Sequence, residues 1–197
     1  MLERIKAAAI EEMIERGLKF TMSDLAARLA VSKRTLYEFF PSKEVLVETI
    51  IDDELNGAIQ EHINIINATN LSFYQKFKLM QTFIPKILGR FNATSERRLV
   101  EDIRRYMPET WAKTKRAQEE QWKLFQEFLQ EGINDGYIRP VNLAVVQKMI
   151  SGALEEMLNE RFLAENDMTI SEVYAQLNEI IMVGMVNPNK IIQTAQL

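Results

Sequence analysis

The 197-residue sequence contains no cysteine and only one histidine, His62. The lack of cysteine excludes disulfides and thiolate metal sites. A lone histidine cannot by itself supply a Ser-His-Asp triad or a multi-histidine metal site. The chain also lacks a glycine-rich phosphate loop and an HExxH motif. We therefore expect a protein that is not an enzyme and has no cofactor and no metal site.

Long apolar runs are also missing. No stretch approaches the roughly twenty apolar residues that a membrane-spanning helix needs, and the N-terminus lacks the apolar region of a signal peptide. We therefore expect no membrane partner and a cytoplasmic location. Hydrophobic residues nevertheless make up 47% of the chain, which supports a substantial core, and the length suits one large or two small domains.

Residues 21–43 are the most informative stretch, because two short helices and a tight turn fit into them. Thr21 and Asp24 have the spacing of a capping box at the start of the first helix, with Asp in place of the usual Glu or Gln. Ser32 can cap the second helix. Pro41 ends it, because the residue before a proline avoids helical geometry. The two helices are expected over about 22–29 and 33–39.

The second of these helices would present polar side chains on its first turn. In a helix-turn-helix, that turn meets base edges in the major groove, where Arg or Lys pairs with guanine and a Thr methyl contacts a thymine methyl. The same spacing also fits a small three-helix core whose charges are only solvated. The candidate DNA-contacting residues are Thr21, Arg28, Ser32, Lys33, Arg34, Thr35, Tyr37 and Lys43.

The pattern Thr21-x-x-Asp-Leu-Ala-x-x-Leu-x-Val-Ser-x-x-Thr-Leu-Tyr-x-x-Phe-x-Ser-Lys resembles the DNA-binding signature of the TetR family of bacterial regulators. The resemblance runs from near Ile5 to near Leu46, and the later helices resemble the family only in number, length and order. Ala30 departs from the family, because many members carry glycine there. Glu38 is a second departure; it could repel phosphate, accept from a cytosine amine or point into solvent, and we favour the last.

The net charge of −4 is unusual for a DNA-binding protein. Residues 1–45 carry eight basic and seven acidic side chains, which gives +1, whereas the remainder carries sixteen basic and twenty-one acidic, which gives −5. Affinity for DNA must therefore rest on a few placed cations and on doubling of the site. We expect modest non-specific binding with a limited dependence on salt.

Glycine and proline punctuate the sequence into an all-α chain of about nine helices, with no β alternation and no internal repeat. We expect a helix-turn-helix DNA-binding domain over 1–46 and a larger helical bundle over 47–197 for ligand binding and dimerisation. Gly17, Gly132 and Gly136 are expected to end helices, and Pro85 is expected to bend one. The remaining expected helices cover about 2–16, 43–66, 72–88, 95–105, 110–131 and 143–164, with a last one from Thr169 or Ser171 to Pro188.

Helix 143–164 and the last helix carry wide apolar stripes. Each also has a glycine in mid-helix, Gly152 and Gly184, where glycine costs about 1 kcal/mol relative to alanine. Close crossing of helices would offset that cost. The resemblance implies that they form a four-helix interface between two copies, although the stripes could instead face only the intrachain core. The candidate interface residues are Met149, Gly152, Ala153, Leu154, Met157, Tyr174, Leu177, Ile181 and Gly184.

Residues 71–128 are rich in aromatic side chains and methionine. Small-molecule sites have mostly apolar walls, yet such stripes are more often core than pocket. The resemblance implies a small-molecule effector that shifts the population toward a form that releases DNA. The candidate pocket residues are Phe77, Met80, Phe83, Arg104, Tyr106, Trp111, Trp122, Phe125 and Met149.

Together these features indicate a homodimeric, sequence-specific regulator of transcription that binds a near-palindromic operator in double-stranded DNA. Repression, relieved by a small molecule, is the default of the family it resembles. One alternative is a regulator or architectural DNA-binding protein without a small-molecule ligand. The other is a helical carrier or adaptor that no longer binds DNA, against which the set Lys33, Arg34, Thr35 and Tyr37 argues.

Overall fold

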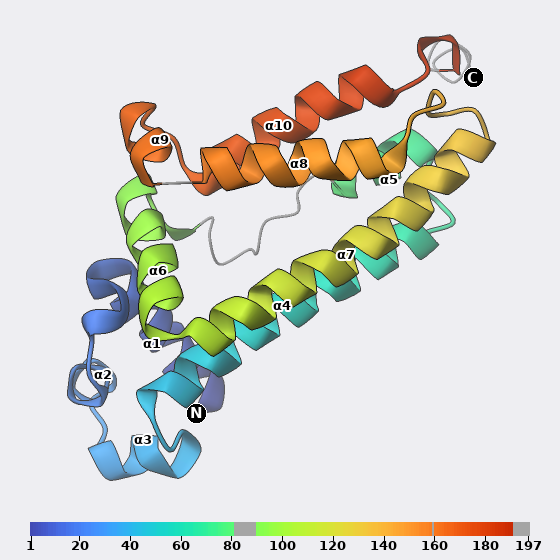
Figure 1. Cartoon of the computed structure of the whole chain (residues 1–197). Coiled ribbons are helices and arrows are strands. Elements are labelled where there is room, and N and C mark those ends of the chain that lie inside the picture. Colours follow the sequence, from blue (N-terminus) through green and yellow to red (C-terminus); the bar gives the residue numbers. More distant parts are fainter. Residues whose placement is uncertain (81–89, 159, 191–197) are drawn as a thin grey trace. The chain divides into compact units, whose positions relative to one another are not determined.

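The structure, a computed structural model, describes residues 1–80, 90–158 and 160–190 and shows an all-α chain (Figure 1). Within these residues nine helices have seven residues or more, as expected, and the only β pairing is an isolated antiparallel bridge between Ile138 and Val186. None of the described helices is long and apolar enough to cross a bilayer. In chain order the elements are α1 (Leu2–Arg16), the 3-10 turn η1 (Gly17–Lys19), α2 (Met22–Leu29), α3 (Lys33–Phe39), α4 (Lys43–Asn67), α5 (Phe73–Met80), α6 (Ala93–Tyr106), α7 (Pro108–Asn134), α8 (Leu143–Met157), α9 (Glu160–Glu165) and α10 (Ile170–Met185).

The chain packs into two compact units. The N-terminal unit comprises Met1–Gly57 and the described part of Pro85–Lys115, and the C-terminal unit comprises the described parts of Ala58–Ile84 and Arg116–Leu197. Helices α4 and α7 therefore contribute residues to both units. The division into a DNA-binding domain over 1–46 and a ligand-binding and dimerisation domain over 47–197 concerns function rather than packing, and it stays a prediction.

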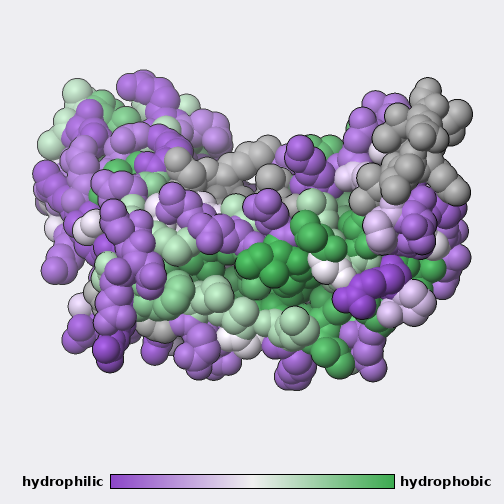
Figure 2. Space-filling model, turned by 90° about the horizontal axis from the view of Figure 1, so that it is seen from above, coloured by the Kyte–Doolittle hydropathy of each residue, from purple (hydrophilic) through white to green (hydrophobic). Residues whose placement is uncertain are grey.

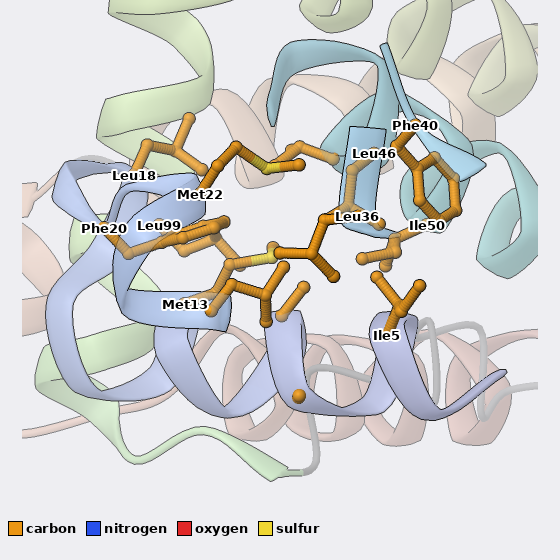
Figure 3. Packing of buried hydrophobic residues seen from close by; sticks show 14 of the residues in the cluster. Ile5, Met13, Leu18, Phe20, Met22, Leu36, Phe40, Leu46, Ile50 and Leu99 are labelled. Atoms are coloured by element: carbon orange, nitrogen blue, oxygen red, sulfur yellow. The ribbon is translucent and has the colours of Figure 1, made fainter. Parts of the chain in front are cut away.

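The core of the N-terminal unit lies between α1, α2, α3 and the first turns of α4 (Figure 3). Met13, Leu36 and Leu46 come from three of these helices and are all fully buried. Leu99 of α6 joins the same cluster, although it lies far along the chain from the other three. The first three helices therefore share their core with a later helix.

A polar clamp fastens α6 to the end of α1 within this unit. The amide of Leu18 donates to Asp102 Oδ2 at 2.7 Å, and a terminal nitrogen of Arg98 donates to the carbonyl of Ile14 at 2.7 Å. Gly17 ends α1, as expected, with φ +61° and ψ −147°. A Cβ there would lie 2.4 Å from Asp102 Oδ2, so the clamp leaves room only for glycine.

The C-terminal unit is built around a stack of aromatic rings. Phe73 of α5 stacks on Phe128 of α7 with centroids 4.7 Å apart, and on Tyr137 at 4.9 Å. Gly132 was expected to end a helix, but it lies inside α7, which continues to Asn134. Glycine is required at this position by packing rather than by a helix end, because a Cβ on Gly132 would lie 2.4 Å from the Phe73 ring.

Several helix boundaries differ from those expected. The single helix expected over 143–164 is two, α8 and α9, and no glycine or proline marks the break after α8. Pro108 was expected to close a helix but begins α7, where its missing amide costs nothing. The helix expected over 72–88 is described only over α5, so the part that contains Pro85 lies outside the described residues.

The last helix starts as predicted and stops early. Thr169 caps α10 in a box with Glu172. The helix ends at Met185, before Pro188, because the chain turns away to pair with the segment after α7. There the amide of Arg139 donates to the carbonyl of Met185 at 2.9 Å, next to the Ile138–Val186 bridge.

Candidate nucleic-acid interface

Two side-chain caps position α2 and α3, and both are confirmed. Asp24 donates its amide to Thr21 Oγ1 at 3.2 Å, and Thr21 returns its own amide to Asp24 Oδ2 at 2.8 Å. These bonds from the Thr21 hydroxyl and amide, with help from Arg16, lower the pKa of Asp24. At the start of α3, the amide of Thr35 donates to Ser32 Oγ at 3.1 Å, and the two hydroxyls lie 2.9 Å apart. The helices therefore begin at the residues that the sequence marks.

The turn between the two helices is tight. Ala30 adopts the left-handed conformation, with φ +54° and ψ +43°. The amide of Val31 then donates to the carbonyl of Ala26 at 3.0 Å, which closes α2. Beyond the turn, Leu36 is fully buried, and Phe40 just after α3 is also buried. Because these two residues anchor one side of α3, the opposite side faces outward.

The outward side of α3 is polar and open. Lys33, Arg34 and Tyr37 are exposed, and the side chains of Lys33 and Tyr37 make no hydrogen bond or ion pair with any residue that the structure describes. Phe39 is exposed as well, at the other end of the helix. An exposed Lys, Arg and Tyr within two turns supply donors and an aromatic edge of the kind that reads bases and phosphates.

Two of the predicted DNA-contacting cations have partners inside the N-terminal unit. Arg28 Nε donates to the buried Glu12 at 2.7 Å, and a terminal nitrogen of the same guanidinium donates to Glu15 at 2.6 Å. Lys43 Nζ donates to the carbonyl of Leu18 at 2.8 Å and lies 5.6 Å from the centroid of the Phe20 ring. Both side chains thus stabilise the unit, and their contact with DNA stays a prediction.

Glu38 does more than point into solvent. Arg34 Nε donates to Glu38 Oε1 at 3.4 Å, one helical turn away. The expectation from the sequence missed this pair. The signal was present, because oppositely charged residues four apart on a helix are neighbours.

The comparisons with known proteins agree with this helix-turn-helix geometry. Residues 5–50 fit the family described as bacterial regulatory proteins, tetR family. The chain belongs to the TetR family. It is 26% identical over 185 residues to the HTH-type transcriptional regulator YvaF of Bacillus subtilis (strain 168), a match that covers 94% of this chain and 95% of YvaF. This TetR-family chain is therefore a DNA-binding regulator of transcription.

Solved structures of the family share the fold. PfmR from Thermus thermophilus has a TM-score of 0.64 at 22% identity, covering 90% of this chain and 96% of PfmR. FadR from Bacillus subtilis, solved in complex with stearoyl-CoA, has a TM-score of 0.64 at 18% identity, covering 91% of this chain and 97% of FadR. At such identities the likeness extends to the arrangement of helices.

Four of the predicted pocket residues of this TetR-family chain gather in the C-terminal unit. Phe77 and Met80 are buried, and Trp122 and Phe125 pack against the same cluster. The ring centroids of Phe77 and Phe125 lie 6.1 Å apart, and those of Trp122 and Phe125 lie 5.7 Å apart. The indole nitrogen of Trp122 is buried without a hydrogen-bond partner among the described residues. Tyr137, which the sequence did not suggest, also joins the aromatic stack.

The other predicted pocket residues are placed differently. Arg104, Tyr106 and Trp111 belong to the N-terminal unit, where the first two are exposed and Trp111 packs against the core. Met149 is exposed on α8. Phe83 lies outside the described residues. A role in ligand binding stays a prediction for all nine residues.

Helices α8 and α10 pack side by side in the C-terminal unit and leave an apolar face open. Figure 2 shows this face as a hydrophobic patch. Val145 and Met149 of α8 and Ile180 and Val183 of α10 are exposed, and of these Val145 and Val183 are absent from the residues that the sequence suggested. The predicted interface residues Ala153, Leu154, Met157, Tyr174, Leu177 and Ile181 are half-buried, and Gly152 and Gly184 are exposed.

Proposed function

We propose that this TetR-family regulator binds a near-palindromic operator as a homodimer and is released from it when a small molecule binds the C-terminal unit. Repression of transcription is the default activity of the family. The observation that carries the proposal is the open polar side of α3, where Lys33, Arg34 and Tyr37 stand exposed beside two capped helix starts. A two-fold dimer would present two such helices to successive half-sites.

The apolar face of α8 and α10 supports the dimer. The side chains of Ile180 and Val183 are 71% and 74% exposed in the single chain, and a contiguous apolar surface of this kind marks an interaction site. Gly152 and Gly184 add a second argument, because no described atom lies within 4 Å of a Cβ built on either. Nothing within the described part of the chain uses their lack of a side chain, so the close approach that would offset their cost comes from a second copy.

The aromatic cluster of the C-terminal unit supports an apolar effector. A ligand among Phe77, Trp122 and Phe125 would meet mostly ring carbon, and the indole nitrogen of Trp122 would donate to one oxygen of the ligand. FadR of Bacillus subtilis, which has the same fold, was solved in complex with stearoyl-CoA. Long-chain acyl-CoA thioesters are therefore the first ligands to test.

The proposal is tested by enrichment from a pool of random duplexes at low ionic strength, followed by thermal shift with candidate ligands. We expect an enriched inverted repeat and at least one ligand that both raises the melting temperature and lowers affinity for that repeat. A ligand that binds without changing DNA affinity would contradict the effector mechanism. A protein that enriches no duplex would contradict the recognition surface itself.

A further inference from the structure

We propose that Glu38 positions Arg34 for one guanine in each half-site and thereby sets base specificity at that position. The inference rests on the proposed binding of α3 in the major groove. Glu38 thus has a role in DNA recognition, although a negative charge in the recognition helix would by itself repel the phosphates.

The geometry of the pair selects one edge of the guanidinium. Arg34 Nε donates to Glu38 Oε1 at 3.4 Å, and the Arg34 side chain bonds to no other described residue. A guanidinium has five N–H groups, one on Nε and four on the two terminal nitrogens. With Nε bonded to Glu38, the N–H groups on the two terminal nitrogens have no partner among the described residues. These two nitrogens match the O6 and N7 acceptors that guanine presents in the major groove.

The pair contributes little before DNA arrives. The side chains of Arg34 and Glu38 are 90% and 60% exposed, and such surface pairs are weak in water. Contact with the groove would displace part of the water around the pair and lower the local dielectric, so the same bond would strengthen when Arg34 meets a base. Holding the arginine in one orientation also reduces the side-chain entropy that binding would otherwise cost.

Glu38 also weakens attraction to phosphates. It offsets the charge of Arg34, and Lys43 is bonded to the carbonyl of Leu18. Lys33 is then the one cation of α3 that no described residue neutralises. Removing Glu38 should therefore have two opposite effects, since affinity for any duplex rises while the preference for guanine falls. A residue with only a structural role would not separate these two quantities.

The test compares base preference at each position of the enriched operator for the wild type, Glu38→Ala, Glu38→Gln, Arg34→Ala and the double variant Arg34→Ala/Glu38→Ala. The chain offers a matched control in α9, where Arg161 Nε donates to Glu165 Oε1 at 2.8 Å and the side chains are 86% and 60% exposed. Glu165→Ala removes an equivalent pair away from α3.

We expect the wild type to prefer guanine about tenfold or more at one position of each half-site, as a bidentate arginine does. Glu38→Ala should lose most of that preference at the same position as Arg34→Ala, and the double variant should lose no more. Glu38→Gln keeps an oxygen acceptor, so it should retain the preference, with higher affinity for unrelated duplexes. Glu165→Ala should match the wild type.

Three results would overturn the inference. The first is a Glu38→Ala protein with an unchanged preference. The second is a loss at a position that Arg34→Ala leaves unaltered, which would make Glu38 a direct reader of a base. The third is a Glu38→Gln protein that behaves like Glu38→Ala. In each case an operator is still enriched, so the proposed function stands; only a wild type that enriches no duplex defeats both.

Discussion

Two exposed surfaces of the chain differ in the kind of side chain that they carry. The open side of α3 in the N-terminal unit carries exposed donors on Lys33 and Arg34, whereas the open face of α8 and α10 in the C-terminal unit carries bare hydrocarbon such as Ile180 and Val183. The surface of α3 suits a polyanion with hydrogen-bond acceptors, and the affinity of such binding falls as the salt concentration rises. The face of α8 and α10 suits only apolar contact, and salt has little effect on contact of that kind. The chain thus carries one exposed surface suited to a polyanion and a separate one suited to apolar contact.

The largest effect should come from charging the apolar face. Ile180→Glu combined with Val183→Glu would bury two unpaired carboxylates from each copy between the two copies, so we expect a monomer in sedimentation. Affinity for the operator should fall at least about 100-fold, because the two half-sites are no longer bound together. Tyr106→Glu puts one such carboxylate on an exposed side chain of α6 and should stay dimeric. A dimeric double variant would show that the face serves another purpose.

The next prediction concerns the polar clamp between α6 and the end of α1 in the N-terminal unit. Gly17→Ala forces a side chain into a conformation suited to glycine and against Asp102 Oδ2, so we expect a loss of about 2–4 kcal/mol in the free energy of unfolding. Urea denaturation measures it. An unchanged midpoint would mean that α6 does not hold the end of α1 as described.

The C-terminal unit contains a group whose burial should make stability depend on pH. Burial lowers the pKa of His62 from 6.5 to about 4. The unfolded chain therefore takes up a proton as pH falls through 6.5, while the folded chain does not until about pH 4. We expect the free energy of unfolding to drop by about 3 kcal/mol across this window. His62→Gln should lack that part of the drop; equal slopes for both proteins would contradict the burial.

The smallest effect, and a favourable one, is expected in the turn before α3. Ala30 has φ +54°, where glycine is free of the Cβ strain that alanine bears. Ala30→Gly should raise the free energy of unfolding by about 0.5–1 kcal/mol, because relief of strain exceeds the added freedom of the unfolded chain. Binding to the operator should not change. Destabilisation by this variant would show that the turn is relaxed with alanine.

The sequence predicted the N-terminal helices better than the rest, because their signals are local. Thr21, Ser32 and Pro41 mark helix ends within a few residues, and α2 and α3 have the bounds expected from them. The partnership of Leu99 with this core is a long-range contact that no local pattern reveals. The early end of α10 has the same origin, since it depends on pairing with Ile138.

The candidate site shows the same limit. Exposure of Lys33 and Tyr37 followed from helical periodicity, because Leu36 anchors the opposite side. The bonds that Lys43 and Arg28 make depend on how α4 and α2 pack on their neighbours, whereas the sequence predicted both residues only as DNA contacts. The break after α8 has no signal that we can identify in the residues around it.

The most direct test of DNA recognition uses the absence of cysteine. In Lys33→Cys the new thiol is the only one in the chain, so no intrachain disulfide competes with a disulfide to a thiol tethered to a base in the major groove of the enriched operator. We expect Lys33→Cys to cross-link efficiently at one base position in each half-site, and Glu165→Cys on α9 not to cross-link. Equal cross-linking by the two variants, or none by Lys33→Cys while the protein stays bound, would contradict the placement of α3 against the bases.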